Sequence, residues 1–199
     1  MNKFDNELNR IKEEIINDSD NIDFTNKGWF PLYTISSKSK ILIVGQAPGI
    51  KAQESQICWN DLSGNRLREW LGVTKDQFYN PDNFALVPMD FYYPGKAKTG
   101  DLPPRKEFSK KWHSRLIENI MDLRLIILIG SYAQKFYLKD SIKRNLTETV
   151  KAYKEYLPNY FPLAHPSPLN IRWFRQNQWF DDEVIPSLKE LVKNIINEK

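Results

Sequence analysis

Two short polar segments each follow an apolar run, and both contain residue types suited to holding a polar ligand. Segment 45–49, Gly-Gln-Ala-Pro-Gly, follows the apolar run 41–44, and segment 165–170, His-Pro-Ser-Pro-Leu-Asn, follows the run 160–164. Continuous apolar runs of this length are typical of strands that are covered on both faces of a parallel sheet. Ligands bind at the carboxyl edge of such sheets, so we expect the two segments to line one pocket.

The first segment matches neither of the two common nucleotide-binding signatures. It lacks Gly-x-Gly-x-x-Gly, and it lacks the Gly-Lys-Ser/Thr end of a phosphate-binding loop. Pro48 stiffens the segment, while Gly45 and Gly49 allow a positive φ or a close approach of a ligand to the backbone. A plain strand-to-helix turn has the same composition, so this loop alone leaves both interpretations open.

His165 is the strongest single candidate for chemistry in the second segment. Most histidines lie on the surface or in a satisfied core, but here Pro166 and Pro168 fix the backbone direction of the loop. A stiff loop that carries a histidine at a strand end favours a functional role. The other histidine, His113, falls within a charged helix, and we predict that it lies at the surface.

Strands and helices alternate along the chain. Apolar runs predict strands at 41–44, 84–89, 125–129 and 160–164. Apolar residues at helical spacing predict helices at 4–17, 63–71, 107–121, about 131–138, 150–156 and 181–196, with Ser63 as an N-cap and Gly72 as a stop. This order predicts an α/β fold, a three-layer α/β/α sandwich around a central four-stranded parallel sheet. The segment 92–105, rich in Pro and Gly, is expected to be a functional or mobile loop.

Length and composition indicate one domain. The 199 residues predict a single domain over 1–199, with a helical N-terminal extension over 1–37. No apolar run is long enough to span a membrane, and residues 1–40 lack the apolar core of a signal peptide, so we expect a cytoplasmic location. Cys58 is the only cysteine, which excludes an internal disulfide and any metal or iron–sulfur site with several Cys ligands.

The net charge of +4 is compatible with an acidic partner such as nucleic acid, although charge alone does not identify one. The positions of the basic residues are more informative than their number. One group lies within 105–115, and Arg172 and Arg175 follow directly after the His165 loop.

Three motifs together resemble those of the uracil-DNA glycosylase superfamily. Its members carry a Gly-Gln/Glu/Met-x-Pro loop after the first strand and a His-Pro-Ser loop after the last, as segments 45–49 and 165–170 do. Segment 58–64, Cys-Trp-Asn-Asp-Leu-Ser-Gly, is similar to the superfamily's aromatic-x-x-x-Ser-Gly segment. The resemblance covers residues 38–192 and is greatest with the single-strand-selective branch, through His-Pro-Ser-Pro-x-Asn and segment 99–104.

The resemblance implies roles for residues in the expected pocket. His165 would donate a hydrogen bond to uracil O2 and so stabilise the anionic leaving base. The backbone amides of Gln46 and Ala47 would contact the base, and Trp59 would stack on it. Core filling is the alternative interpretation of Trp59.

Departures from the superfamily's motifs leave two roles open. Members with a strong water-activating group have Asp or Asn at the position of Ala47, and Asp61 is the best substitute here. An alternative interpretation of Asp61 is a carboxylate at a helix start. The Asn that reads uracil has no clear equivalent, since Asn83 precedes the second strand and Asp90 follows it. We name Asp90 as the base-binding candidate.

The resemblance also implies contacts with DNA. Leu169 occupies the place of the apolar residue that enters the base stack when the target base is flipped out. Arg172 and Arg175 would bind phosphates, and the hydroxyl groups of Ser63, Ser131 and Ser167 would donate to them.

The sequence therefore predicts a monomeric, monofunctional DNA glycosylase that removes uracil or a related deaminated base without a metal or cofactor. Neither the 45–49 nor the 165–170 segment contains a lysine, so we expect water as the nucleophile. One alternative is a catalytically weak member that binds nucleic acid or senses damage, and another is an enzyme acting on free nucleosides or nucleotides. A steep salt dependence of DNA binding would distinguish the first two from the third.

Overall fold

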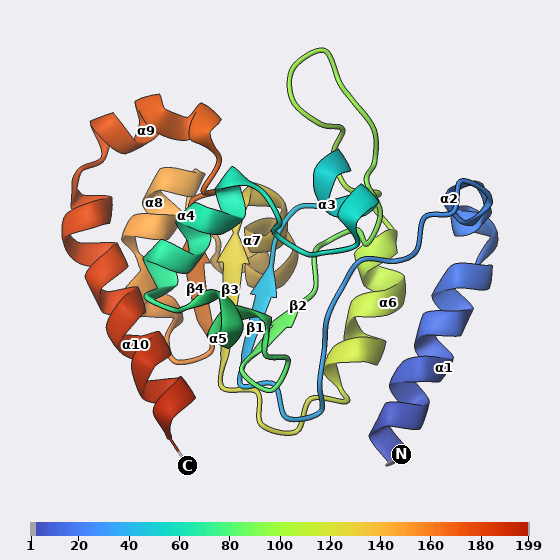
Figure 1. The fold of residues 1–199 in the computed structure, drawn as a ribbon. Helices are drawn as coiled ribbons and strands as arrows, with labels where there is room; N and C mark the ends of the chain where they lie inside the picture. Colours follow the sequence, from blue (N-terminus) through green and yellow to red (C-terminus); the bar gives the residue numbers. More distant parts are fainter. Residues whose placement is uncertain (1–2, 199) are drawn as a thin grey trace.

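Four parallel strands form the centre of the structure, a computed structural model that describes residues 3–198. Residues 1, 2 and 199, at the ends of the predicted domain, lie outside the described residues. The strands are β1 (Ile41–Val44), β2 (Phe84–Leu86), β3 (Leu125–Ile129) and β4 (Tyr160–Leu163), in the order β2-β1-β3-β4 (Figure 1). The predicted four-stranded parallel sheet is confirmed. β2 is shorter than the predicted 84–89, although the amides of Val87 and Met89 still donate to the carbonyls of Ile43 and Gly45 beyond its end.

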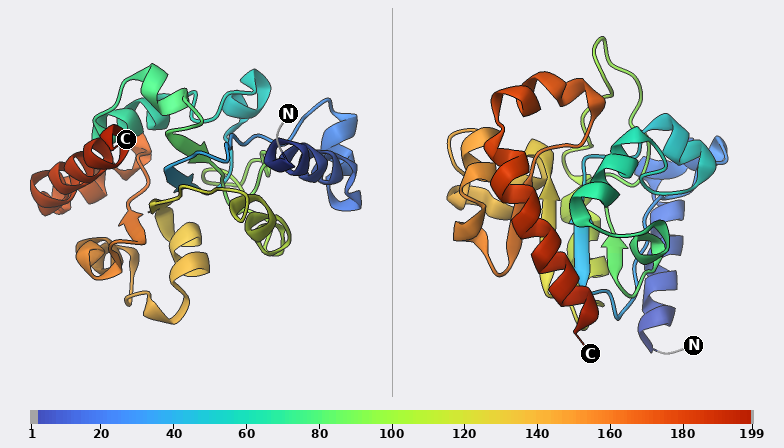
Figure 2. Two further views of the ribbon diagram at one scale, coloured as in Figure 1. Left: turned by 90° about the horizontal axis from the view of Figure 1, so that it is seen from below. Right: turned by 60° about the vertical axis from the view of Figure 1, so that its left-hand side comes forward.

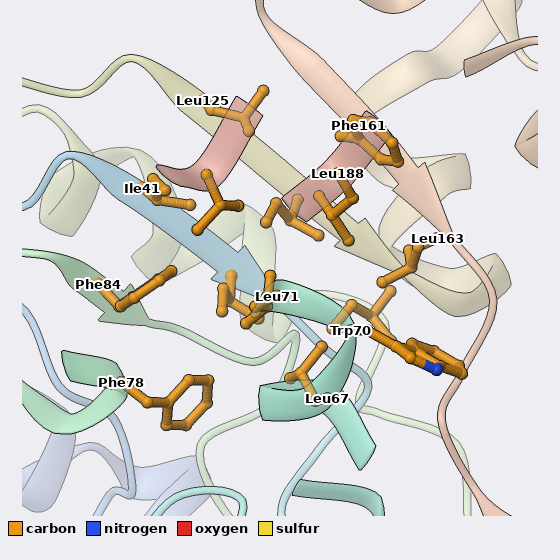
Figure 3. Close-up of a cluster of buried hydrophobic side chains, with 14 of the residues drawn as sticks. Ile41, Leu67, Trp70, Leu71, Phe78, Phe84, Leu125, Phe161, Leu163 and Leu188 are labelled. Atoms are coloured by element: carbon orange, nitrogen blue, oxygen red, sulfur yellow. The ribbon is translucent and has the colours of Figure 1, made fainter. Parts of the chain in front are cut away.

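Helices cover both faces of the sheet, which confirms the predicted sandwich (Figure 2). Alternate residues of β1 enter two separate cores, with Ile41 and Ile43 in one and Leu42 and Val44 in the other. The first core packs against α4 (Leu62–Leu71) and α10 (Ile185–Asn197), and Figure 3 shows its side chains. The second core packs against α1 (Lys3–Asn17), α6 (Phe108–Ile117) and α7 (Gly130–Leu138).

The remaining helices are short and connect these layers. They are η1 (Ser19–Asn21), α2 (Ile22–Asn26), α3 (Ile50–Ser55), α5 (Lys75–Tyr79), η2 (Lys139–Ser141), α8 (Leu146–Lys151), η3 (Tyr153–Tyr156), η4 (Pro168–Asn170), α9 (Ile171–Gln176) and η5 (Phe180–Val184). The predicted helix 150–156 is in fact divided between α8 and η3. α9 was not predicted, because it has too few residues for apolar periodicity to indicate it.

The N-terminal extension packs closely against the rest of the domain. Ile11 and Ile15 of α1 are fully buried among residues of the second core. Farther along, Thr34 forms an antiparallel bridge with Leu86, so this part of the extension borders the free edge of β2. Within residues 3–198, no helix is both long and apolar enough to cross a membrane.

Two of the sequence predictions are wrong in their local detail. The N-cap of α4 is Asp61 and not Ser63, because the Asp61 carboxylate accepts a hydrogen bond from the amide of Gly64 at 2.8 Å. His113 is buried and not at the surface, because α6 packs this face against the segment that follows β2. Its Nε2 donates to the carbonyl of Pro88 at 2.8 Å, and its Nδ1 accepts from the hydroxyl of Tyr137 at 2.7 Å.

Candidate active site

A pocket of about 570 Å³ lies at the carboxyl edge of the sheet, and both motif loops line it, as the sequence predicts. The segment that contains Trp59 forms another part of the wall. Of the predicted site residues, nine line the pocket: Gln46, Ala47, Trp59, Asp61, Ser63, Ser131, His165, Ser167 and Leu169. The other three, Asp90, Arg172 and Arg175, are not among its lining residues. The fold thus joins three segments that are widely separated in the sequence.

The loop after β1 is fixed by the segment that follows β2. The carbonyl of Gly45 accepts from the amide of Met89 at 2.9 Å, and that of Gln46 accepts from the amide of Asp90 at 3.2 Å. The Gln46 side chain donates to the carbonyl of Leu102 at 3.2 Å. This loop is therefore connected to both the end of the second strand and the 92–105 loop.

Trp59 has a backbone conformation that its neighbours enforce. Its φ of 55° lies in the left-handed region, which bulky residues rarely adopt. A Cβ atom on Gly64 would lie 1.8 Å from the Trp59 carbonyl oxygen, and a Cβ on Gly45 would lie 2.8 Å from the indole ring. Only glycine at these two positions leaves room for Trp59. The indole lies 5.8 Å from the His165 ring, between centroids, with an interplanar angle of 33°.

The His165 ring has a defined tautomer. The amide of Ser167 donates to its Nδ1 at 3.2 Å, so in the neutral ring the proton is on Nε2. Burial lowers the pKa of His165 below its usual value, while the negative charge of Asp61 opposes that shift. The ring is therefore neutral at pH 7 and has one N–H to donate. The side chain of Asn170 holds the loop by donating to the His165 carbonyl at 2.9 Å.

Asp61 caps a helix and also faces the pocket. Its carboxylate begins α4, as one of the two interpretations of the sequence holds, and the side chain stays exposed. It lines the pocket, and its charge acts on the ring of His165. The capping role therefore leaves a carboxylate beside the histidine.

Asp90 is buried below the pocket wall and is fully occupied by other groups. Its two carboxylate oxygens accept from Nε and an Nη of Arg105 at 2.7 and 2.8 Å, and from the amides of Tyr92 and Arg105. Asn83 lies at the other end of β2, where its side chain donates to the carbonyl of Gln77. The structure therefore brings neither residue to the pocket.

Sequence reasoning missed several residues that line the pocket. Gly100 and Asp101 come from the 92–105 loop, which rises above the sheet in Figure 1, and Tyr132 and Trp173 come from α7 and α9. Asp101 accepts from the hydroxyl of Tyr93 at 3.4 Å. The Pro and Gly content of the loop was the signal for its importance, but it did not single out Asp101.

Four of the six predicted DNA-contacting residues line the pocket, and the two arginines do not. The side chains of Ser63, Ser131 and Ser167 line it, and Leu169 is 82% exposed at its rim. Arg172 and Arg175 are exposed on α9, above the carboxyl ends of the strands (Figure 1). Trp173, which lies between them in α9, is the residue of this helix that lines the pocket.

Neither the Cys58 thiol nor a metal-binding cluster within residues 3–198 adds a catalytic group to the site. Burial raises the pKa of the Cys58 thiol to about 12, so this pocket residue is not a thiolate at neutral pH. Among residues 3–198, no three His, Cys, Asp or Glu side chains are grouped so that they could hold a metal ion. Besides Cys58, the titratable side chains that line the pocket are the carboxylates of Asp61 and Asp101, the imidazole of His165 and the phenol of Tyr132.

Comparison with known proteins gives one family match. A family profile described as "Uracil DNA glycosylase superfamily" matches residues 32–189. The chain is also similar to a candidate uracil DNA glycosylase from Methanosarcina acetivorans, solved by solution NMR, with 16% sequence identity and a TM-score of 0.46. That alignment covers 82% of this chain and 96% of the other.

Proposed function

Because this chain belongs to the uracil DNA glycosylase superfamily, we propose that it is a monofunctional glycosylase that removes uracil or a related deaminated base from DNA. The observation that supports this most directly is the neutral His165. The Ser167 amide donates to its Nδ1, which leaves the proton on Nε2, and the residue lines the same pocket as Trp59. An indole face and a single N–H donor suit a planar base with a carbonyl oxygen.

His165 stabilises the charge that develops on the leaving base. Cleavage of the N-glycosidic bond leaves an anionic base and an oxocarbenium-like sugar. A donor fixed in place before the reaction typically contributes about 3–4 kcal/mol to such a step. The Ser167 amide and the Asn170 side chain hold His165 in this orientation, so little reorganisation is needed.

Trp59 provides the stacking surface for the flipped base. Stacking of a base on an aromatic ring is worth about 1–3 kcal/mol. Gly45 and Gly64 keep the indole in its position, and the backbone of Gln46 and Ala47 forms the adjoining wall. Asp90 has no part in base binding in this proposal, because Arg105 occupies its carboxylate.

Asp61 stabilises the cationic sugar and orients the attacking water. Ala47 has no polar side chain, so the loop after β1 provides no general base. We assign the role of general base to the Asp61 carboxylate, since it lines the pocket and acts electrostatically on His165. Water is the nucleophile because the motif loops contain no lysine.

The partner is DNA, which lies across the mouth of the pocket. Leu169 enters the stack where the base has left, and Arg172 and Arg175 bind backbone phosphates. Ser63, Ser131 and Ser167 donate to phosphates near the flipped nucleotide. The absence of a side-chain base at Ala47 favours a second candidate function, a member that binds damaged DNA without cutting it.

Single-turnover cleavage of oligonucleotides tests the proposal. The substrates contain uracil, hypoxanthine or xanthine, single-stranded or paired, and alkali reveals the abasic product. We expect cleavage of at least one substrate. We also expect His165→Ala to slow it by about 100- to 1000-fold with little loss of DNA binding, because one donor to the leaving base is removed.

Two results would count against this assignment. An equal loss of cleavage and binding in His165→Ala would show that the histidine is not a selective catalytic donor. Binding without any product at micromolar enzyme would favour the sensing function.

A further inference from the structure

Leu62 is an exposed apolar residue at the pocket rim for which the proposed function has no role. Its side chain is 70% exposed, although it lies in the first turn of α4 between two pocket-lining residues, Asp61 and Ser63. Among the exposed large apolar side chains of residues 3–198, only Leu169 has a higher exposed fraction. The two most exposed apolar side chains therefore both lie at the edge of this pocket.

A shallow groove connects Leu62 to the loop that carries Leu169. It has a volume of about 460 Å³, shares Asp61 and Ser63 with the main pocket, and has both Leu62 and Pro168 among its lining residues. The carbonyl of Pro166 accepts from an Nη of Arg66 at 3.5 Å, which confirms that α4 lies beside the His165 loop. The two leucines thus border adjoining parts of one rim.

The backbone holds Leu62 in place. The Asp61 carboxylate caps the helix directly before it, and Gly64 packs against the carbonyl of Trp59. The backbone of Leu62 therefore has a fixed position at the start of a capped helix. This rigidity is what a residue needs if it is to separate stacked bases.

The chemistry of the groove matches the backbone of DNA. Lys51, Asn60 and Asn65 line it with an ammonium group and two amides, which are side chains that contact phosphate oxygens, and the Asp61 carboxylate belongs to the part that the groove shares with the main pocket. An apolar residue beside such donors is the arrangement by which proteins wedge open a base step while holding the strand.

We infer that Leu62 is a second wedge, which enters duplex DNA beside Leu169 and stabilises the opened base step. This inference rests on the proposed function, because it assumes that the pocket receives a base from DNA. Only paired DNA has a closed stack to open. Leu62 therefore acts on duplex substrates far more than on single strands.

The test compares Leu62→Ala with wild type on the same target base in duplex and in single-stranded DNA. We expect the ratio of the duplex rate to the single-strand rate to fall by about tenfold, because one of two wedges is lost. Met121→Ala is the matched control, since Met121 is 67% exposed and lies at the opposite edge of the sheet, next to Ser37. It should leave the ratio unchanged.

A second measurement reports on the wedge without any cleavage. In a His165→Ala background, a 2-aminopurine next to the target base becomes brighter when the enzyme unstacks it. We expect a smaller increase for His165→Ala/Leu62→Ala at saturating protein. An unchanged increase, or an equal loss of rate on duplex and single strands, would overturn the inference. A wild-type protein that cleaves neither substrate would instead contradict the proposed function, and the fluorescence would still decide the role of Leu62.

Discussion

Asp61 combines a structural and a chemical role that one substitution can separate. Asn is as good an N-cap as Asp, so Asp61→Asn keeps the bond to the Gly64 amide and removes only the charge. We expect single-turnover cleavage to slow by at least about tenfold, because a carboxylate no longer stabilises the sugar cation. We also expect the pKa of His165 to fall further, since the Asp61 charge raises it. The acid limb of the pH–rate profile should therefore move to lower pH.

The urea unfolding curve of Asp61→Asn is the control for its helix. An unchanged midpoint shows that the cap is intact, and the rate then reports on the charge alone. An unchanged rate in a stable variant would mean that another group orients the water.

Single residues were predictable where a motif defines them and not where a distant partner does. His165 and Trp59 belong to contiguous motifs with stiff or small neighbours, and the structure places their rings 5.8 Å apart. Asp90 and His113 have partners far along the chain, in Arg105 and in Tyr137. Nothing in the local sequence shows that these partners will be adjacent, so the surface position predicted for His113 is wrong and Asp90 does not line the pocket.

The turn from Trp59 into α4 depends on the absence of a side chain at Gly64. A Cβ there would lie 1.8 Å from the Trp59 carbonyl oxygen, so Gly64→Ala must displace the backbone that presents the indole. We expect lower stability, by about 1–3 kcal/mol, and a large loss of cleavage. Gly49→Ala is the matched control, because a Cβ at Gly49 meets nothing within 4 Å. Thermal unfolding and single-turnover rates of both variants test this; equal behaviour would contradict it.

Arg105 connects the N-terminal helices to the loop beside the pocket. It makes a bidentate pair with the fully buried Asp90, and it donates to the side chain of Asn21 at 2.7 Å. Loss of one partner leaves a buried charge, so we expect Arg105→Leu to lower the free energy of unfolding by about 3–5 kcal/mol. Urea denaturation measures this. Arg10→Leu is the control, because it breaks an exposed pair with Glu7 and should change the free energy of unfolding only slightly. Similar losses of unfolding free energy in the two variants would argue against the role of Arg105.

The sheet was predictable as a set of elements, whereas the short connecting helices were not. Each strand is a continuous apolar run, because in a parallel sheet both faces are buried. α9 spans six residues, which is too short for a periodic pattern, and the stretch 150–156 that was predicted as one helix is divided between α8 and η3. The side of the pocket that Trp173 lines therefore emerged only from the structure.

The whole molecule places its chemistry at one edge because all four strands run in the same direction. The loops after β1 and β4 bring Gln46 and His165 to a single pocket, and the segment between α3 and α4 adds Trp59 to it. The helical layers and the N-terminal extension pack against the sheet and hold this edge in position. One such connection is His113, which joins α6 to the carbonyl of Pro88, a residue of the pocket wall.

His113 makes the stability of the fold depend on pH. Burial lowers its pKa to about 4, while the unfolded chain has the usual value near 6.5. Between these values the unfolded state binds a proton that the folded state does not, so stability falls as the pH is lowered. The loss between pH 7.5 and pH 5 is about 2 kcal/mol for this one group. His113→Gln keeps a donor for Pro88 and an acceptor for Tyr137 but does not titrate. Urea unfolding at both pH values should therefore show a smaller loss in the variant; an identical loss would show that the buried imidazole is not the source.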